Sequence, residues 1–411
     1  MVKLILFECR KHFLKKSLVI AIILFSLLNI AKVYSVYNDH SLLSKKSDPL
    51  WNNLYWDMYE EFGGTMTDEK IETLMSIYKP LEKQTADKTA STRSNNPDTY
   101  TGNVYNDYYF FRWNFVNPME YAYMYKNYAN DVAANAKENM DFYESLGNQY
   151  EYQKNADIAA RFKGRNVEEF SYTEMFQYYI HYDFSALLVL LICLYALINV
   201  FVMEKETEMD ILLLTTKAGG LRTTLAKLLS SAMFVCIVCF WFWSIDFVAF
   251  SSIFGSLEAI FSPIYVIENF ANSSIGVSLG TYAMLSNLVK TAGILVLSLV
   301  FLLVSTFFKN ALFPFVISMF LAFGVIYTQE MVLGSGRIFL KVVNPFVLVV
   351  NRELFRKTEY INLFNYPVIS YIPALLFAAA WGTVCILGVF VLVRKNAVHR
   401  KGGRKHAINT L

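Results

Sequence analysis

Few residues of this sequence have the types and spacing that catalysis needs. The 411 residues contain no GxxxxGK[ST] phosphate loop, no HExxH zinc motif and no GxSxG nucleophile motif. Cys236 and Cys239 form a CxxC pair inside an apolar run that lacks further metal ligands. The histidines are scattered, and His12 in the basic N-terminal flank is expected to be a solvated surface residue. We therefore expect no catalytic residue, metal site or bound cofactor in this chain, and no enzyme activity of its own.

Besides Lys32 near the end of the run 17–37, two charged residues lie inside long apolar runs, where a charge is costly. Asp246 lies in the run 228–254 and Lys290 in the run 283–308. At about 1.5 Å per residue they reach similar depths in a bilayer. We expect an ion pair between them that faces the interior of a helix bundle, either as a polar lining of a path or as a structural pair.

The strongest chemical pattern is a polar link between two apolar runs, residues 203–227. It begins with alternating acids and continues with a leucine patch, a threonine pair, a glycine break and a basic amphipathic restart. This composition predicts a short helix, a tight turn and a second helix, on which a separate protein pushes. The residues expected to contact that protein are Glu204, Glu206, Asp210, Leu212, Leu213, Leu214, Thr215, Thr216 and Lys217.

The charges of this link should also have partners. Glu204, Glu206 and Glu208 are expected to pair with cations on the other protein or on the N-terminal segment. The alternative for residues 211–214 is that they only lie in the lipid surface.

The composition places these residues in a membrane protein. Apolar residues make up 55% of the chain and its mean hydropathy is +0.34, which is too apolar for a soluble protein. A bilayer-spanning helix needs about 20 apolar residues. Six runs qualify, at residues 17–37, 184–203, 228–254, 283–308, 311–328 and 367–393.

The remaining segments define the expected topology. Residues 1–16 read as a basic amphipathic helix lying in the membrane surface, and 394–411 as a basic tail. The 204–227 linker and both termini carry Lys or Arg, which favours a cytoplasmic location for all three. Residues 38–183 are then extracellular. The segment 329–366 is basic yet falls outside in this scheme, so we expect it to re-enter the membrane or lie on its outer leaflet.

The region 38–183 is acidic and rich in tyrosine. It has 23 Asp and Glu against 14 Lys and Arg, and 18 of the 27 tyrosines. Asp68 and the pair Asn117-Pro118 open predicted helices, and Gly147 and Gly164 end two of them. We expect a small helical domain, whose tyrosines form either its core and rim or a surface that grips an amphipathic peptide.

The linker and the topology together resemble one family. An acidic entry after the second span, a leucine-rich core ending in two threonines (212–216, LLLTT) and a lysine further on, Lys227, are typical of permeases of the type-two class of ABC exporters. The large domain 38–183 departs from many members, which have a short loop there.

The resemblance implies a mechanical role. In that family the linker holds a coupling helix that docks in a groove on a separate ATPase subunit, which binds the ATP and magnesium. We therefore expect an all-α, six-span plasma-membrane permease that works with two ATPase subunits, with a second permease copy or a homologous permease, and with surrounding lipid, but with no nucleic acid. Its cargo is expected to be a peptide, antimicrobial or amphipathic.

The alternative is a sensor or mechanical transmitter that moves its outer domain without passing cargo. A transporter needs polar residues that line a path, for which Asn29, Ser185, Asn199 and Ser318 are candidates. A transmitter needs a stiff link into the second span, for which residues 168–182 are the candidate.

Overall fold

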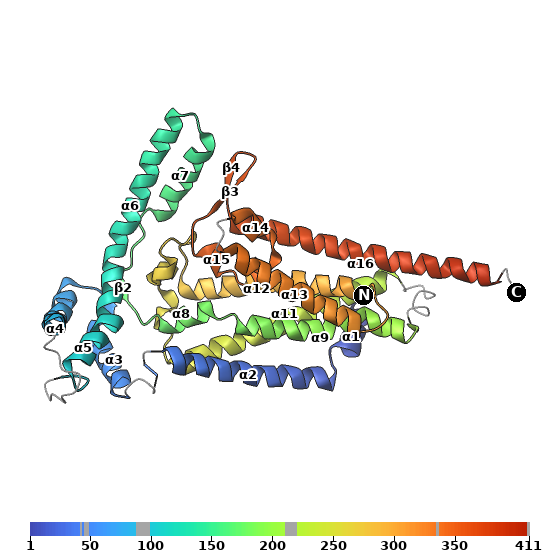
Figure 1. The fold of residues 1–411 in the computed structure, drawn as a ribbon, viewed down its shortest axis with the longest axis horizontal. Coiled ribbons are helices and arrows are strands. Elements are labelled where there is room, and N and C mark those ends of the chain that lie inside the picture. The colour runs from blue at the N-terminus through green and yellow to red at the C-terminus, as the bar shows by residue number, and fades with distance from the viewer. Residues whose placement is uncertain (42, 45–48, 88–98, 210–219, 334–336, 409–411) are drawn as a thin grey trace.

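The computed structural model describes residues 1–41, 43–44, 49–87, 99–209, 220–333 and 337–408. A bundle of long helices lies along the long axis of the molecule, and a mostly helical domain caps one end of it (Figure 1). We call this the head domain (residues 49–181), and the two ends of the bundle the head end and the linker end.

Among the described residues, five helices are long and apolar enough to cross a membrane, and a sixth bundle helix, α13, contains a shorter apolar stretch, Leu312–Thr328. All six coincide with the predicted runs to within a few residues, apart from extensions at their polar ends. They are α2 (Lys16–His40), α9 (Phe184–Glu206), α11 (Leu221–Phe254), α12 (Leu279–Ser305), α13 (Leu312–Leu333) and α16 (Tyr371–Ile408). The segment 394–408, expected as a tail, continues α16 as helix.

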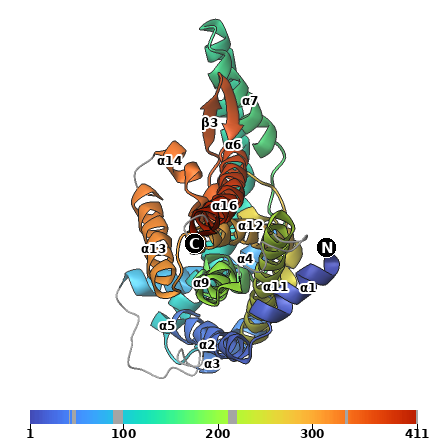
Figure 2. The same ribbon diagram turned by 90° about the vertical axis from the view of Figure 1, so that its right-hand side faces the viewer.

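Seen along the bundle, α9 lies between α2 and α13 (Figure 2). The short N-terminal helix α1 (Val2–His12) packs on α11 and α9 at the linker end. The rings of Phe13 and Phe234 stack there with centroids 4.4 Å apart.

The head domain is built from helices with clear local start and stop signals. Its elements are α3 (Pro49–Phe62), β1 (Gly64–Thr65), α4 (Asp68–Ala86), α5 (Val104–Phe111), the π-helical turn η1 (Arg112–Val116), α6 (Asn117–Ser145), α7 (Gln149–Phe162), β2 (Glu169–Phe170) and α8 (Glu174–His181). Thr67 caps α4 by accepting a hydrogen bond from the Lys70 amide at 3.3 Å. Gly147 and Gly164 have positive φ just beyond α6 and α7, as the sequence predicts.

The tyrosines of this domain contribute largely to its core. Tyr55 stacks on the fully buried Phe115, with centroids 5.2 Å apart, and packs against Tyr172. Tyr78 and Tyr108 stack at 5.6 Å. The interpretation of the tyrosines as core residues therefore holds for this set, whereas Tyr123 on α6 is exposed.

The head domain is tied to the loop between α11 and α12, which consists of η2 (Glu258–Phe261), η3 (Ile264–Val266) and η4 (Glu268–Phe270). Tyr125 stacks on Tyr265 at 4.7 Å and donates to the Ala271 carbonyl at 3.0 Å. Arg165 and Arg161 donate to the carbonyls of Ser273 and Ser274 at 3.0 and 2.8 Å. Charge-assisted bonds of this kind are strong, so they hold the domain firmly against the head end of the bundle.

The segment after α13 is not purely helical. It holds α14 (Ile338–Val343), η5 (Pro345–Leu348), α15 (Arg352–Phe355) and an antiparallel hairpin, β3 (Tyr360–Leu363) with β4 (Tyr366–Ile369), which the all-α expectation missed. The basic residues of this segment argue against a location outside the cell, but they form ion pairs with acidic side chains of the same chain. Lys341 pairs with Glu359 at 2.8 Å, Arg356 with Glu353 at 2.9 Å, and Arg352 with Asp183.

This segment inserts against α12. Leu348 and Val349 are fully buried and pack on Gly293, near the middle of α12. A Cβ at Gly293 would lie 2.9 Å from Val349 Cγ2 and 3.0 Å from Leu348 Cβ. The glycine therefore permits the close approach of the two segments.

Replacing this glycine tests the packing. Gly293→Ala is expected to lower the apparent melting temperature of the detergent-purified chain, because overpacking a tight core costs about 1–3 kcal/mol. Gly382→Ala is the matched control, since a Cβ there would have its nearest neighbour at 3.6 Å, an ordinary contact. Both changes raise helix propensity equally, so equal melting temperatures would contradict the close packing at Gly293.

Candidate functional site

A buried cluster of charged side chains joins three helices at the linker end. Lys227 of α11 donates to Glu8 of α1 at 2.9 Å and to Glu204 of α9 at 2.7 Å. Lys11 donates to the same carboxylate oxygen of Glu204 at 2.5 Å. Lys227, Glu8 and His12 are each 2% exposed. We call Glu8, Lys11, His12, Glu204 and Lys227 the linker-end cluster.

The cluster balances its charge internally. Two carboxylates face two ammonium groups, and His12 Nε2 lies 3.3 Å from Glu8 Oε2. Burial by itself raises the pKa of Glu8, but His12 and Lys227 outweigh it and lower this pKa to about 2. Burial lowers the pKa of His12, more than the contact with Glu8 raises it. The cluster therefore holds ionised Glu8 beside a neutral His12.

The spacing of the sequence explains how these groups meet. Glu8 and His12 are four residues apart and share one face of α1, which turns toward the bundle, while Val2, Leu6 and Phe7 are exposed. Glu204 lies near the end of α9 and Lys227 near the start of α11, so α1 contacts both helix ends that flank the 204–227 linker.

Three of these groups also have the spacing of metal ligands. One ligand atom each from Glu8, His12 and Glu204 lies within 4.8 Å of the others. The ammonium of Lys227 already bonds to both carboxylates, so it supplies the positive charge that a metal ion would bring.

The predicted linker residues fall into two groups. Glu204 pairs with Lys11 of the N-terminal helix, as expected. Glu206 instead accepts a hydrogen bond from the Ala311 amide at 3.2 Å, which ties the end of α9 to the start of α13. The other predicted contacts, Asp210, Leu212, Leu213, Leu214, Thr215, Thr216 and Lys217, lie outside the described residues.

A second buried polar cluster lies at the head end. Asn29 of α2 donates to Asp246 of α11 at 2.5 Å and accepts from the Tyr182 hydroxyl at 2.7 Å. Lys290 Nζ of α12 lies 3.5 Å from Asp183 Oδ1, and Arg352 also forms an ion pair with Asp183. We call Asn29, Tyr182, Asp183, Asp246, Lys290 and Arg352 the head-end cluster. It joins α2, α11, α12 and the segment after α13 to the junction between α8 and α9.

The expected ion pair between Asp246 and Lys290 is corrected here. Both residues line one cavity of about 10 Å³, so their similar depth is confirmed, but each bonds to another partner. Asp183, just before α9, supplies the carboxylate to Lys290, and Asp246 takes an amide donor. The cavity has room for about one water molecule.

The two clusters are separated by about the thickness of a membrane. Asp246 follows Lys227 by 19 positions in α11 (246 − 227), which at 1.5 Å per residue is about 28 Å. The hydrocarbon core of a bilayer is about 30 Å thick. This spacing would allow the two clusters to lie at the two boundaries of a bilayer, where ionised groups cost least.

The proposed path residues are not equivalent. Asn29 and Ser185 converge at Asp246 within the head-end cluster, and both are buried. Asn199 bonds to the Tyr195 carbonyl within α9, and Ser318 is buried with no hydrogen-bond partner among the described residues. The stiff link expected over 168–182 is a strand followed by α8, which ends at His181 before α9 begins.

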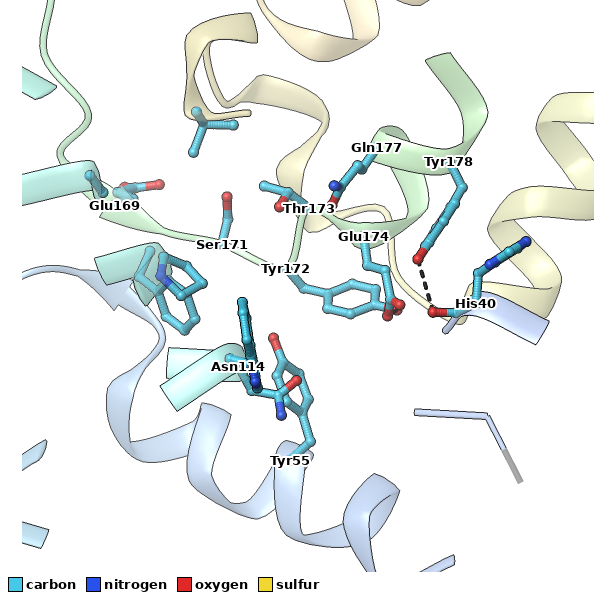
Figure 3. Close-up of a pocket in the computed structure, with 15 residues that line it drawn as sticks. His40, Tyr55, Asn114, Glu169, Ser171, Tyr172, Thr173, Glu174, Gln177 and Tyr178 are labelled. Atoms are coloured by element: carbon cyan, nitrogen blue, oxygen red, sulfur yellow. Dashed lines mark hydrogen bonds between the residues drawn. The ribbon is translucent and has the colours of Figure 1, made fainter. Parts of the chain in front are cut away.

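A polar cavity of about 330 Å³ lies where the head domain meets the bundle (Figure 3). It is lined by residues of α3, η1, α6 and the segment from β2 to α8, and by His40 at the end of α2. The hydroxyl of Tyr178 donates to the His40 carbonyl at 2.9 Å and closes one side of it.

Sequence reasoning missed Glu8 and His12. Both lie in the basic N-terminal flank, whose polar side chains the sequence predicts to be solvated. For His12 this prediction is wrong, because the side chain is buried. The available signal was the i, i+4 spacing of an acid and a histidine on one face of an amphipathic helix.

Removing the shared cation tests the linker-end cluster. Lys227→Met leaves two buried carboxylates without their common partner, which typically destabilises by about 3–5 kcal/mol. We expect a clear fall in the apparent melting temperature and release of α1, measured as faster proteolysis after its exposed Arg10. Arg222→Met, an exposed cation on the same helix, is the control. Equal behaviour of the two variants would refute the role of the cluster.

The lowered pKa values predict loss of stability in acid. The unfolded chain protonates His12 below about pH 6.5, before the folded chain does, so the folded state loses stability as the pH falls through that value. Glu8 adds a second loss as the pH falls from about 4.5 toward 2. We expect the difference in melting temperature between about pH 7.5 and pH 5.5 to be smaller in His12→Gln than in the wild type. In Arg10→Gln this difference should stay at the wild-type value; equal shrinkage in both variants would count against His12.

Comparison with known proteins adds no family to this description. A scan of protein-family models, a search of curated proteins and a search of solved structures each found no match to the chain. What the chain does is therefore argued from the geometry of its two buried clusters and of the head domain.

Proposed function

We propose that this chain is the membrane-spanning permease subunit of an ATP-driven exporter of the ABC type. The observation that carries the proposal is the linker-end cluster, which binds α1 to both helix ends that flank residues 204–227. A push on the linker would therefore move α1, α9 and α11 together instead of bending one loop. Rigid-body movement of packed helices is a common way to transmit such a force.

The ATPase is a separate protein in this proposal. Two copies of this ATPase would bind to the linker. They, and not this chain, would bind ATP and magnesium, since the sequence contains no phosphate-binding loop. The linker end and both termini would face the cytoplasm, and the head domain would lie outside the cell. With α13 counted, the chain would cross the plasma membrane six times.

A second permease copy would complete the transport path. On α9, Leu187, Leu191 and Tyr195 are exposed at four-residue intervals, on the helix that lies between α2 and α13. A partner copy covering this face would enclose a path between two chains. The cargo would be a peptide. The acidic head domain would attract a positively charged one.

A mechanical transmitter is the second candidate, and one observation favours it. The head domain is bound to the loop 255–278 by several direct hydrogen bonds. The cavity beside Asp246, inside the bundle, has room for only about one water molecule. A chain of this kind could move its head domain in response to the ATPase without passing cargo.

The ATPase connection is tested by co-purification. Leu213→Asp places a charge in the predicted apolar contact and is expected to release the ATPase that purifies with the tagged chain. Thr207→Asp, an exposed position in the same linker, should retain it. If no nucleotide-hydrolysing protein accompanies the wild-type chain, or if both variants retain it, the proposal fails.

Reconstituted vesicles distinguish the two candidates. A permease would accumulate a fluorescent cationic peptide in an ATP-dependent manner. A transmitter would show ATP-dependent changes in distance between a label on the α6–α7 hairpin and one on α16, without accumulation of the peptide.

A further inference from the structure

An apolar groove with a volume of about 680 Å³ lies between α11 and α12. Residues of η2 and Tyr179 of α8 also line it, and no charged residue occurs among the described residues of its lining. Ligand sites in proteins commonly have volumes of this size. We call it the lateral groove, and its walls consist mainly of large apolar side chains: Phe240, Trp243, Phe247, Phe261, Met284 and Leu288.

The lateral groove lies along the apolar length of two helices that can cross a membrane. Its lining runs from Phe240 to Val248 on α11, eight positions (248 − 240) or about 12 Å. Phe240 and Val248 follow Lys227 of the linker-end cluster by 13 and 21 positions, which correspond to about 20 and 32 Å. With that cluster at one boundary of a hydrocarbon core about 30 Å thick, the groove would face the half of the bilayer nearer to the head domain.

Free polar groups of the groove gather at its head end, where α12 begins (Figure 1). The hydroxyls of Ser278 and Thr281 lie 2.9 Å apart and share one hydrogen bond. That bond uses one of their two hydroxyl hydrogens, so the other can be donated to an oxygen of a ligand.

The polar side chains further along the groove already have partners. Ser244 donates to the Phe240 carbonyl at 2.8 Å, and Asn287 donates to the Tyr179 hydroxyl at 2.8 Å. The end of the groove away from the head domain is formed by Phe240 and Leu288. The groove therefore suits a molecule with a polar end toward the head domain and an apolar body.

The shape of the groove is set by close packing of its own walls. Tyr179 and Ala283 are buried, whereas Phe261 is 86% exposed and Met284 70% exposed. At the head end, a Cβ on Gly280 would lie 2.6 Å from Ile260 Cγ1, so this glycine allows η2 to pack closely on the start of α12. A ligand would thus be contacted on several sides, which a flat helix surface does not offer.

The position of the groove favours lipid over a second copy of the chain. The exposed face of α9 proposed for a second copy opens between α2 and α13, whereas the groove lies between α11 and α12 (Figure 2). A partner on α9 would leave the groove open to the bilayer. An unbranched acyl chain can lie parallel to α11 and α12, and the ester and phosphate oxygens of a phospholipid accept hydrogen bonds.

We infer that the lateral groove binds one acyl chain of a membrane phospholipid, with the oxygens of the lipid at Ser278 and Thr281. The bound chain would lie against the hydrogen bond between Tyr179 and Asn287, which joins α8 to α12. The lipid would therefore be a part of the head end of the bundle. This inference does not depend on the proposed ATP-driven export.

The test is photolabelling of the purified full chain in nanodiscs of dioleoylphosphatidylcholine, without an ATPase. The probe is a phosphatidylcholine with a diazirine in one acyl chain, and mass spectrometry identifies the labelled residues. Met284 and Leu376 each lie five positions after the first residue of their helices, and they are 70% and 61% exposed. Leu376 is outside the groove. We expect at least about fivefold more label at Met284, because the groove adds contacts to the bound chain.

Filling the groove should abolish this preference. Ser244→Trp places a large side chain in the groove, and label at Met284 is expected to fall to the level at Leu376. Ser252→Trp, at an exposed serine of the same helix outside the groove, is the control and should label as the wild type does.

The wild-type chain alone can overturn the site, whether or not the variants fold. Equal label at Met284 and Leu376 would mean ordinary lipid contact only. Less label at Met284 than at Leu376 would mean that another occupant, such as a second copy, covers the groove. Equal loss of label in the two variants would also contradict the inference. Since no ATPase is present, the result is independent of whether Leu213→Asp releases one.

Discussion

The architecture depends on one ammonium group shared by two carboxylates. Lys227 is buried between Glu8 and Glu204, and these three residues come from three different helices. A buried ion cluster is poor evidence for net stability, because desolvation offsets much of the attraction. It does define geometry, since this arrangement of α1, α9 and α11 gives each of these charges a partner. The cluster therefore ties the N-terminal helix to the two helices that flank the linker.

The head-end cluster makes the corresponding connection at the other end of the bundle. The linker-end cluster contains residues of α9 and α11, and the head-end cluster contains Asp246 of α11 and Asp183, the residue just before α9, so buried charges lie at both ends of these two helices. Aromatic packing and arginine bonds to the loop carbonyls make the head domain an extension of that end. This arrangement suits a transporter and a transmitter equally well. What separates the two is whether a second copy encloses a path along α9.

The sequence by itself determined the positions of the bundle helices, because a span requires a run of apolar residues that any reader can count. Caps and glycines likewise placed the ends of α4, α6 and α7, which are local properties of the chain. Tertiary structure alone decided which polar residues meet. Lys227 and Glu8 are 219 positions apart, and Lys290 pairs with Asp183 instead of the expected Asp246. Such contacts depend on how helices pack and rotate against one another, and neither the spacing nor the composition of a single segment contains that information.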